Sequence, residues 1–128
     1  MLSFYTMNFL INLWYDSKKL ISEEFCFMFI VQSTFPVPDE KALEVIEIYK
    51  NRSRLVDKNH GFIRFLLLQN EKNKGEITVH MEWETKEDYL KWVRSTEFKD
   101  IHELEKKYPD KELASVIPTV KQFAVVAE

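Results

Sequence analysis

A tryptophan and a histidine stand on two adjoining helical patterns in the stretch YLKWVRSTEFKDIH, residues 89–102. Trp92 belongs to the first pattern and His102 to the second, and Ser95 with Thr96 between them is a pair that commonly starts a helix. Both aromatic side chains border apolar stripes, so we expect them to point toward the same core. Trp92 can simply pack there, or it can present a rigid plane to a flat ligand.

His102 has two interpretations. In one, it is a partly buried side chain that packs its ring and makes a local hydrogen bond. In the other, it is a metal ligand, because neutral imidazole is a common one. A single histidine does not build a zinc site, which takes three or four protein ligands. It is enough for haem, since the porphyrin supplies four further donors to the iron.

The other polar candidates are weaker. His80 is expected on the polar side of a strand, and His60 in a turn beside Gly61. An acidic cluster is most simply the solvated start of a helix, where negative charge is favoured; it comprises Glu84, Glu87 and Asp88.

Composition limits the class of protein. The chain has 128 residues, of which 45% are hydrophobic and 14% aromatic, and this predicts one domain with a substantial core. A net charge of −3 gives no basic surface of the kind that nucleic-acid binding needs. The single cysteine, Cys26, excludes an internal disulfide and fits a cytoplasmic location.

The first 26 residues are expected to be an extension of unknown role. Their apolar stretch is interrupted by Asn8 and Asn12, lacks the basic start of a signal peptide, and falls short of the ~20 apolar residues that span a membrane. We therefore predict no membrane association and a domain at residues 27–128. A small N-terminal strand or an interface arm is the alternative for residues 1–26.

The rest of the chain alternates between strand and helix patterns. An apolar strand is stopped by Pro36 and Pro38, and Asp39 is the expected N-cap of the helix that follows. Thr85 and Asp88 resemble a capping box. The expected elements are a strand at 26–35, a helix at 39–56, a strand at 62–69, a turn at 70–75, a strand at 76–83, helices at 85–93 and 96–105, a loop at 108–112 and a strand at 119–127.

This β-α-β-β-α-β order predicts an α+β fold, the ferredoxin-like plait. Both helices of such a plait cover one face of the sheet, yet the strands carry apolar residues on both faces. An apolar face left open predicts a partner surface. We expect a homodimer that packs sheet against sheet and forms a dimeric α/β-barrel.

Three segments in order resemble the antibiotic biosynthesis monooxygenase (ABM) superfamily, and most closely its IsdG-like haem-degrading monooxygenases. They are MFIVQSTFPV (28–37), YKNRSRLVDKNHGFIRFLLL (49–68) and EITVHMEWETKEDYLKWVRSTEFKDIH (76–102). The resemblance covers about residues 27–128 and implies the same plait and the same dimer.

The resemblance also implies roles for three residues. His102 stands where the family has the proximal haem ligand, and Trp92 where a tryptophan crowds the haem and helps force it out of plane. The family's catalytic asparagine on the first strand falls on Ser33. A serine can still donate a hydrogen bond, but it is shorter and has no amide. This departure affects the oxygenation step more than haem binding.

Three further residues are implied to line the pocket. Arg52 aligns with a basic position near the haem edge and is a candidate partner for a propionate; a surface arginine that ends a helix is the equally acceptable alternative. Tyr49 and Phe35 are implied to line the pocket wall.

The implied activity is oxidative opening of haem with release of iron, in which haem is both substrate and cofactor, O2 is consumed, and an external electron donor such as a reductase supplies electrons. Two alternatives remain. One is a cofactor-independent ABM-type monooxygenase acting on a polycyclic phenol or quinol, with His102 as an acid–base or positioning group. The other is a non-catalytic dimer, haem-binding or purely structural, which Ser33 favours.

Overall fold

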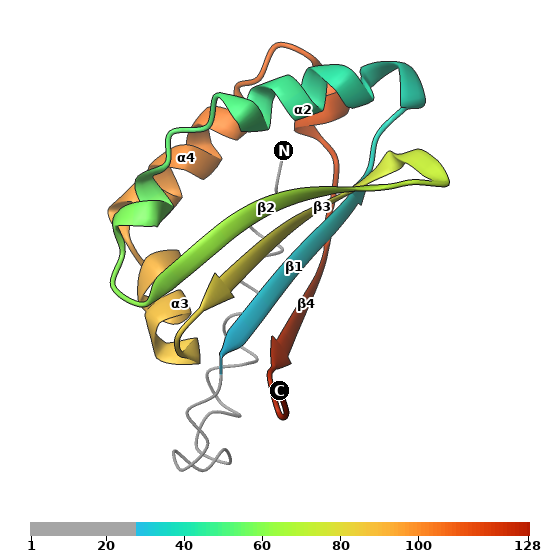
Figure 1. Cartoon of the computed structure of the whole chain (residues 1–128). Helices are drawn as coiled ribbons and strands as arrows, with labels where there is room; N and C mark the ends of the chain where they lie inside the picture. Colours follow the sequence, from blue (N-terminus) through green and yellow to red (C-terminus); the bar gives the residue numbers. More distant parts are fainter. Residues whose placement is uncertain (1–27) are drawn as a thin grey trace.

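The computed structural model describes residues 28–128, and the predicted extension at residues 1–26 lies outside the described residues. The elements follow the expected order (Figure 1). They are β1 (Phe29–Pro36), η2 (Asp39–Lys41), α2 (Ala42–Lys50), η3 (Leu55–Lys58), β2 (Phe62–Asn70), β3 (Asn73–Trp83), α3 (Lys86–Val93), α4 (Thr96–Lys106), α5 (Lys111–Ala114) and β4 (Thr119–Ala124).

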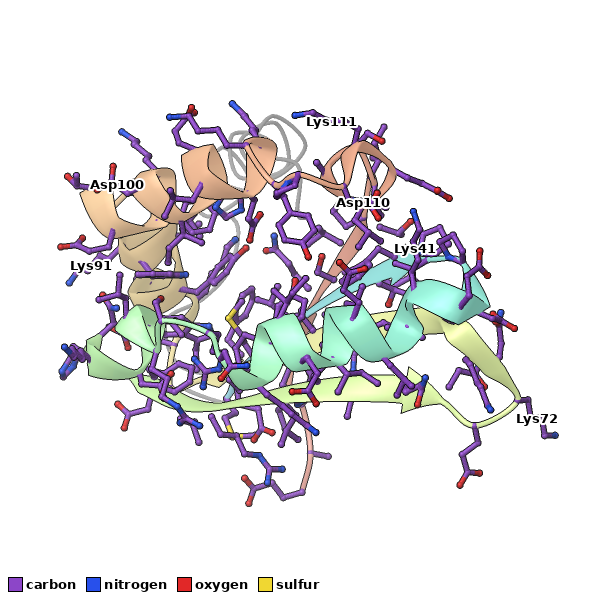
Figure 2. All side chains as sticks on the ribbon, turned by 90° about the horizontal axis from the view of Figure 1, so that it is seen from above. Lys41, Lys72, Lys91, Asp100, Asp110 and Lys111 are labelled. Carbon is purple, nitrogen blue, oxygen red and sulfur yellow. The ribbon has the colours of Figure 1, made fainter. Side chains whose placement is uncertain are left out.

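The strands form one antiparallel sheet in the order β2-β3-β1-β4. Helices α2 and α4 lie together over one face of this sheet, as Figure 1 shows. This arrangement confirms the predicted ferredoxin-like plait. The short helix α5 is tied to the start of α2 by Lys41, whose Nζ lies 2.8 Å from Asp110 Oδ2 (Figure 2).

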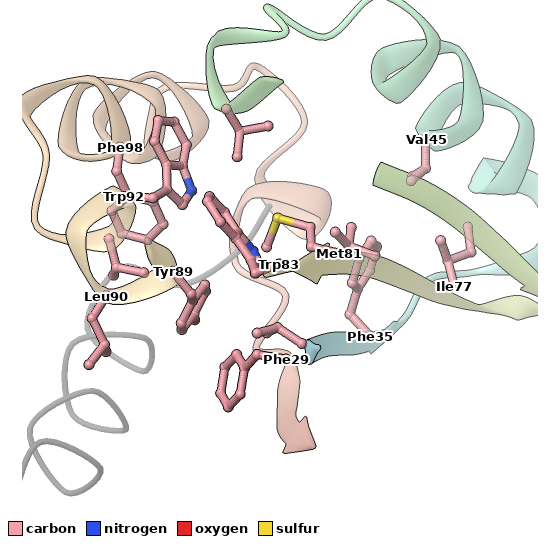
Figure 3. Close-up of a cluster of buried hydrophobic side chains, with 14 of the residues drawn as sticks. Phe29, Phe35, Val45, Ile77, Met81, Trp83, Tyr89, Leu90, Trp92 and Phe98 are labelled. Carbon is pink, nitrogen blue, oxygen red and sulfur yellow. The ribbon is translucent and has the colours of Figure 1, made fainter. Parts of the chain in front are cut away.

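The core lies between the sheet and the helices, and alternating inward side chains on the two central strands form its floor (Figure 3). The buried side chains of β1 and β3 on this face are Phe29, Val31, Ser33, Phe35, Ile77, Val79, Met81 and Trp83, and Glu82 is buried on the opposite face.

Two predicted helix starts are confirmed by their caps. The Thr85 hydroxyl accepts a hydrogen bond from the backbone N–H of Asp88, and the Ser95 hydroxyl accepts one from that of Phe98. The prediction for Asp39 is wrong: it is the first residue of the 3-10 turn η2, and its side chain makes no cap.

The predicted helix at 39–56 is also wrong in its extent. Helix α2 ends at Lys50, and Arg54 adopts a left-handed backbone conformation with φ of 60° before η3 begins. Polar side chains replace the helical pattern here: the Asn51 amide donates to the carbonyl of Glu47 at 2.9 Å, and the Ser53 hydroxyl accepts from the N–H of Leu55.

The remaining corrections are small. The turn predicted at 70–75 is shorter, because β2 and β3 extend to Asn70 and Asn73. The loop predicted at 108–112 gives way to α5, whose cap is the Asp110 side chain. The last strand ends at Ala124 rather than at residue 127.

The opposite face of the sheet carries no helix within the described residues. Leu66, Leu68 and Phe123 are exposed, at 37%, 40% and 43% of their surface. Between them lies a polar group in which Glu82 accepts from Arg64 and pairs with His80. The face is therefore apolar at its edges and charged near its middle.

Candidate functional site

His102 is held by its own helix. It is one of two fully buried residues of α4, with Phe98, and only 3% of its surface is exposed. Its Nδ1 lies 2.9 Å from the carbonyl oxygen of Phe98, one turn earlier. A carbonyl only accepts, so Nδ1 carries the hydrogen and, in the neutral ring, Nε2 carries the lone pair. Metal-bound histidines are typically oriented in this way by a carbonyl or carboxylate partner.

Burial keeps the imidazole of His102 neutral. Burial away from water lowers the pKa of His102, and the nearby carboxylate of Glu105 opposes that effect without reversing it. The neutral imidazole, which is the form that binds metals, therefore predominates at pH 7.

An apolar cavity of about 350 Å³ lies beside His102, between the α2–η3 segment, α4 and the β2–β3 half of the sheet. It falls in the size range of small-molecule sites. Its lining residues include Tyr49, Arg52, Val79, Met81, Trp92, Phe98, His102 and Glu105. The exposed residues Asn51, Arg54 and Leu104 mark the side where it opens to solvent.

Trp92, Phe98 and His102 all line this cavity, and the Phe98 ring contacts both of the others. The Phe98 ring packs edge-on against Trp92, with centroids 5.7 Å apart, and lies 4.1 Å from the imidazole centroid. Figure 3 shows Trp92 and Phe98 adjacent at the helical end of the core. The sequence predicted that Trp92 and His102 share a core, and this is confirmed. The roles of Phe98, as the carbonyl acceptor and as the ring between them, were not anticipated.

Of the two aromatic residues expected to line the pocket, only Tyr49 does so. The Tyr49 ring lies between Phe35 and Phe65, with centroid separations of 6.2 and 6.1 Å. Tyr49 lines the cavity, whereas Phe35 supports it from behind. The Tyr49 hydroxyl is buried, and this burial, reinforced by the charge of Glu105, raises its pKa well above the usual range.

Arg52 lies at the cavity wall but already has a partner. Its guanidinium makes two hydrogen bonds to the Asp57 carboxylate, at 2.8 and 3.2 Å, and its Cζ lies 4.1 Å from the Phe65 ring centroid. This pair was not visible in the sequence. Arg52 follows the end of α2, as one interpretation expected, yet its side chain is mostly buried.

Ser33 is buried in the sheet and does not line the cavity. It is 2% exposed and pairs across the sheet with Val79, which does line the cavity. Among the described residues its hydroxyl has no hydrogen-bond partner. Ser33 and the cavity are therefore neighbours separated by the wall that Val79 contributes.

The weaker candidates lie away from this cavity. His80 bonds to Gln32 and Glu82 on the open face of the sheet, as its place on the polar side predicted. His60 lies with Glu84 and Asp88 near the start of α3, with ligand atoms within 4.8 Å of one another. The hydroxyl of Thr85 donates to Asp88, which fits the expected helix start.

Comparison with known proteins places the chain in a family. The profile described as antibiotic biosynthesis monooxygenase matches residues 28–104. A Bacillus mycoides protein named "Heme-degrading monooxygenase" is 33% identical over 85 residues, which cover 65% of this chain and 78% of the relative. A relative of the same name from Halalkalibacterium halodurans is 34% identical over 77 residues, 59% of this chain and 66% of the relative.

Solved structures share the fold. The haem degrader MhuD of Mycobacterium tuberculosis, solved with two haems in its active site, superposes with a TM-score of 0.61 at 20% identity, covering 79% of this chain and 97% of MhuD. The ActVA-Orf6 monooxygenase of Streptomyces coelicolor, solved with nanaomycin D, gives 0.65 at 14% identity, covering 80% and 90%. In the described part of the chain, every helix is too short or too polar to cross a bilayer. By fold and by sequence, the chain belongs to the antibiotic biosynthesis monooxygenase family, as its three motif segments predicted.

Proposed function

We propose that this protein is a haem-degrading monooxygenase that binds haem through His102 and opens the porphyrin oxidatively with release of iron. The observation that carries the proposal is the neutral imidazole of His102, fixed through Nδ1 at an apolar cavity that Trp92 also lines. Relatives about one-third identical in sequence bear the name of this activity.

The residues present fit the group. A single neutral imidazole with its Nδ1–H already engaged offers Nε2 to iron, which is the one protein ligand that haem needs. The aromatic rings of Trp92 and Phe98 suit a flat ligand, and the opening beside Leu104 leaves room for a planar molecule that extends beyond the cavity. When bound, haem supplies the redox chemistry with O2. Trp92 would pack against the bound porphyrin from its place in the cavity wall, and the apolar walls would exclude water.

The proposal includes partners outside the chain. Oxygen activation needs electrons, and we expect an external donor such as a reductase to supply them. We place the protein in the cytoplasm, since its single cysteine is the usage that a reducing compartment tolerates.

A haemin titration followed by reduction tests the function. We expect a shifted Soret band that saturates at one haemin per chain, and then decays when ascorbate is added with catalase present to remove peroxide. Iron release is followed with a ferrous chelator. A Soret band that does not shift overturns the proposal.

The two alternative functions give different results in the same titration. A shifted band that persists under the reductant indicates a non-catalytic haem-binding dimer, which is favoured by the position of Ser33 behind the cavity wall. An unshifted band, with oxygen uptake on an anthracene-type quinol, indicates the cofactor-independent monooxygenase.

We further propose a homodimer that packs the open sheet faces together. The exposed side chains of Leu66, Leu68 and Phe123 support it, because an apolar face of this kind favours burial. Sedimentation at micromolar concentration should give a dimer mass. Leu66→Lys should shift the mass toward the monomer, whereas Leu43→Lys, at an exposed leucine on α2, should not. A monomeric parent protein would refute the dimer.

A further inference from the structure

The hydroxyl of Tyr49 is a buried donor without a hydrogen-bond partner among the described residues. It projects from α2 on a ring held between Phe35 and Phe65, and that ring lines the cavity beside His102. Burial raises its pKa, so the oxygen keeps its proton and remains a donor. Tyr108 lines the same cavity but differs, because its hydroxyl donates to Glu44 at 2.7 Å.

Such a hydroxyl destabilises the protein without ligand. Leaving a buried polar group unsatisfied costs about 1–3 kcal/mol. Phenylalanine would fill the same space at Tyr49 without that cost. A ligand that brings an oxygen acceptor to this point removes the penalty.

The surroundings indicate the chemistry of that acceptor. On its other side, Tyr49 borders a second hollow, of about 430 Å³, whose lining includes Lys50, Arg52 and Arg54. Lys50 pairs with Glu47, while Arg52 and Arg54 share the carboxylate of Asp57. These three cations are matched by Glu47, Asp57 and, on the cavity side, Glu105. The preference for an anionic oxygen therefore comes from the guanidinium groups of Arg52 and Arg54 beside Tyr49, and not from a net charge.

We propose that the Tyr49 hydroxyl donates a hydrogen bond to a carboxylate of the bound substrate, at the boundary between the apolar cavity and the basic hollow. The inference rests on the proposed function: haem carries its own oxygen atoms only in its two propionate carboxylates. Tyr49 is then a positioning residue that fixes which edge of the porphyrin enters beneath α2. A planar ligand without a carboxylate gains nothing from it.

Tyr49→Phe tests this, because it removes one oxygen and little else. Without ligand, the variant should melt a few degrees higher than the parent, since the unsatisfied group is gone. Its affinity for haemin should fall about 10- to 150-fold, the range of a hydrogen bond to a charged group. Its affinity for iron octaethylporphyrin, which has no oxygen atoms, should equal that of the parent.

Tyr108→Phe is the matched control. It removes the hydroxyl that bonds to Glu44, so it should not raise the melting temperature, and it should leave the ratio of the affinities for haemin and iron octaethylporphyrin as in the parent. If the parent binds haemin and Tyr49→Phe binds it equally well, the inference is wrong. Equal weakening for both porphyrins also overturns it, because the acceptor is then not a carboxylate. If the parent itself binds no haemin, the proposed function has failed, and this inference fails with it.

Discussion

His102→Ala should abolish tight haemin binding. The side chain is the one we expect to hold the iron, and in the described chain the other histidines, His60 and His80, lie on elements away from the cavity. We expect the affinity to fall by at least about 100-fold, or about 2.7 kcal/mol, leaving only apolar contact between the porphyrin and the walls. The measurement is a Soret titration, with circular dichroism to verify the fold.

Two controls separate ligation from packing. His80→Ala, on the open face of the sheet, should bind haemin like the parent. Free imidazole should partly restore the Soret shift of His102→Ala, because it can occupy the space that the truncated side chain leaves. If His102→Ala binds and degrades haemin like the parent, then the iron-ligand assignment fails, and the haem proposal loses its main support among the residues.

Ser33→Asn should raise the rate of haemin decay by about 10- to 100-fold. An asparagine side chain is longer than that of serine and carries the amide donor of the family's residue. A hydrogen bond from it to the reacting oxygen would contribute about 1–3 kcal/mol. The larger residue also has to fit a close-packed position, so we expect it to melt at a lower temperature. The measurement is Soret decay under a reductant with catalase present.

Ser33→Ala is the comparison. It removes a buried hydroxyl that has no partner among the described residues, so turnover should stay near that of the parent and stability should not fall. A folded Ser33→Asn variant that degrades haemin no faster than Ser33→Ala would show that the amide of the family's asparagine is not what limits this chain.

The sequence predicted the faces of elements better than their ends. Apolar spacing carried the predicted helix through Val56, and Val56 is indeed buried, yet the chain leaves the helix at Asn51. Periodicity indicates which side chains face the core. Val56 still faces the core from the 3-10 turn η3, although the α-helix has already ended at Lys50. The caps at Thr85 and Ser95 were predictable because a cap depends on residues three positions apart.

The sequence likewise predicted some features of the candidate site and not others. Spacing alone indicated that Trp92 and His102 share a core. The hydrogen bond from His102 to the Phe98 carbonyl was not predictable from residue types, because its acceptor is backbone. The pairing of Arg52 with Asp57 depends on the turn that ends α2, which periodicity did not reveal. The depth of Ser33 required the sheet register.

Helix α4 buries only Phe98 and His102 fully, so one of its two deep attachments to the rest of the protein is the residue proposed to hold the ligand. A group bound by that residue would link the helix to the sheet across the cavity. Ligand binding would then raise the free energy needed for local unfolding of α4. The helix would detach more easily when the cavity contains no ligand and less easily once it is filled. The substrate would be a structural element of the fold until its own ring is opened.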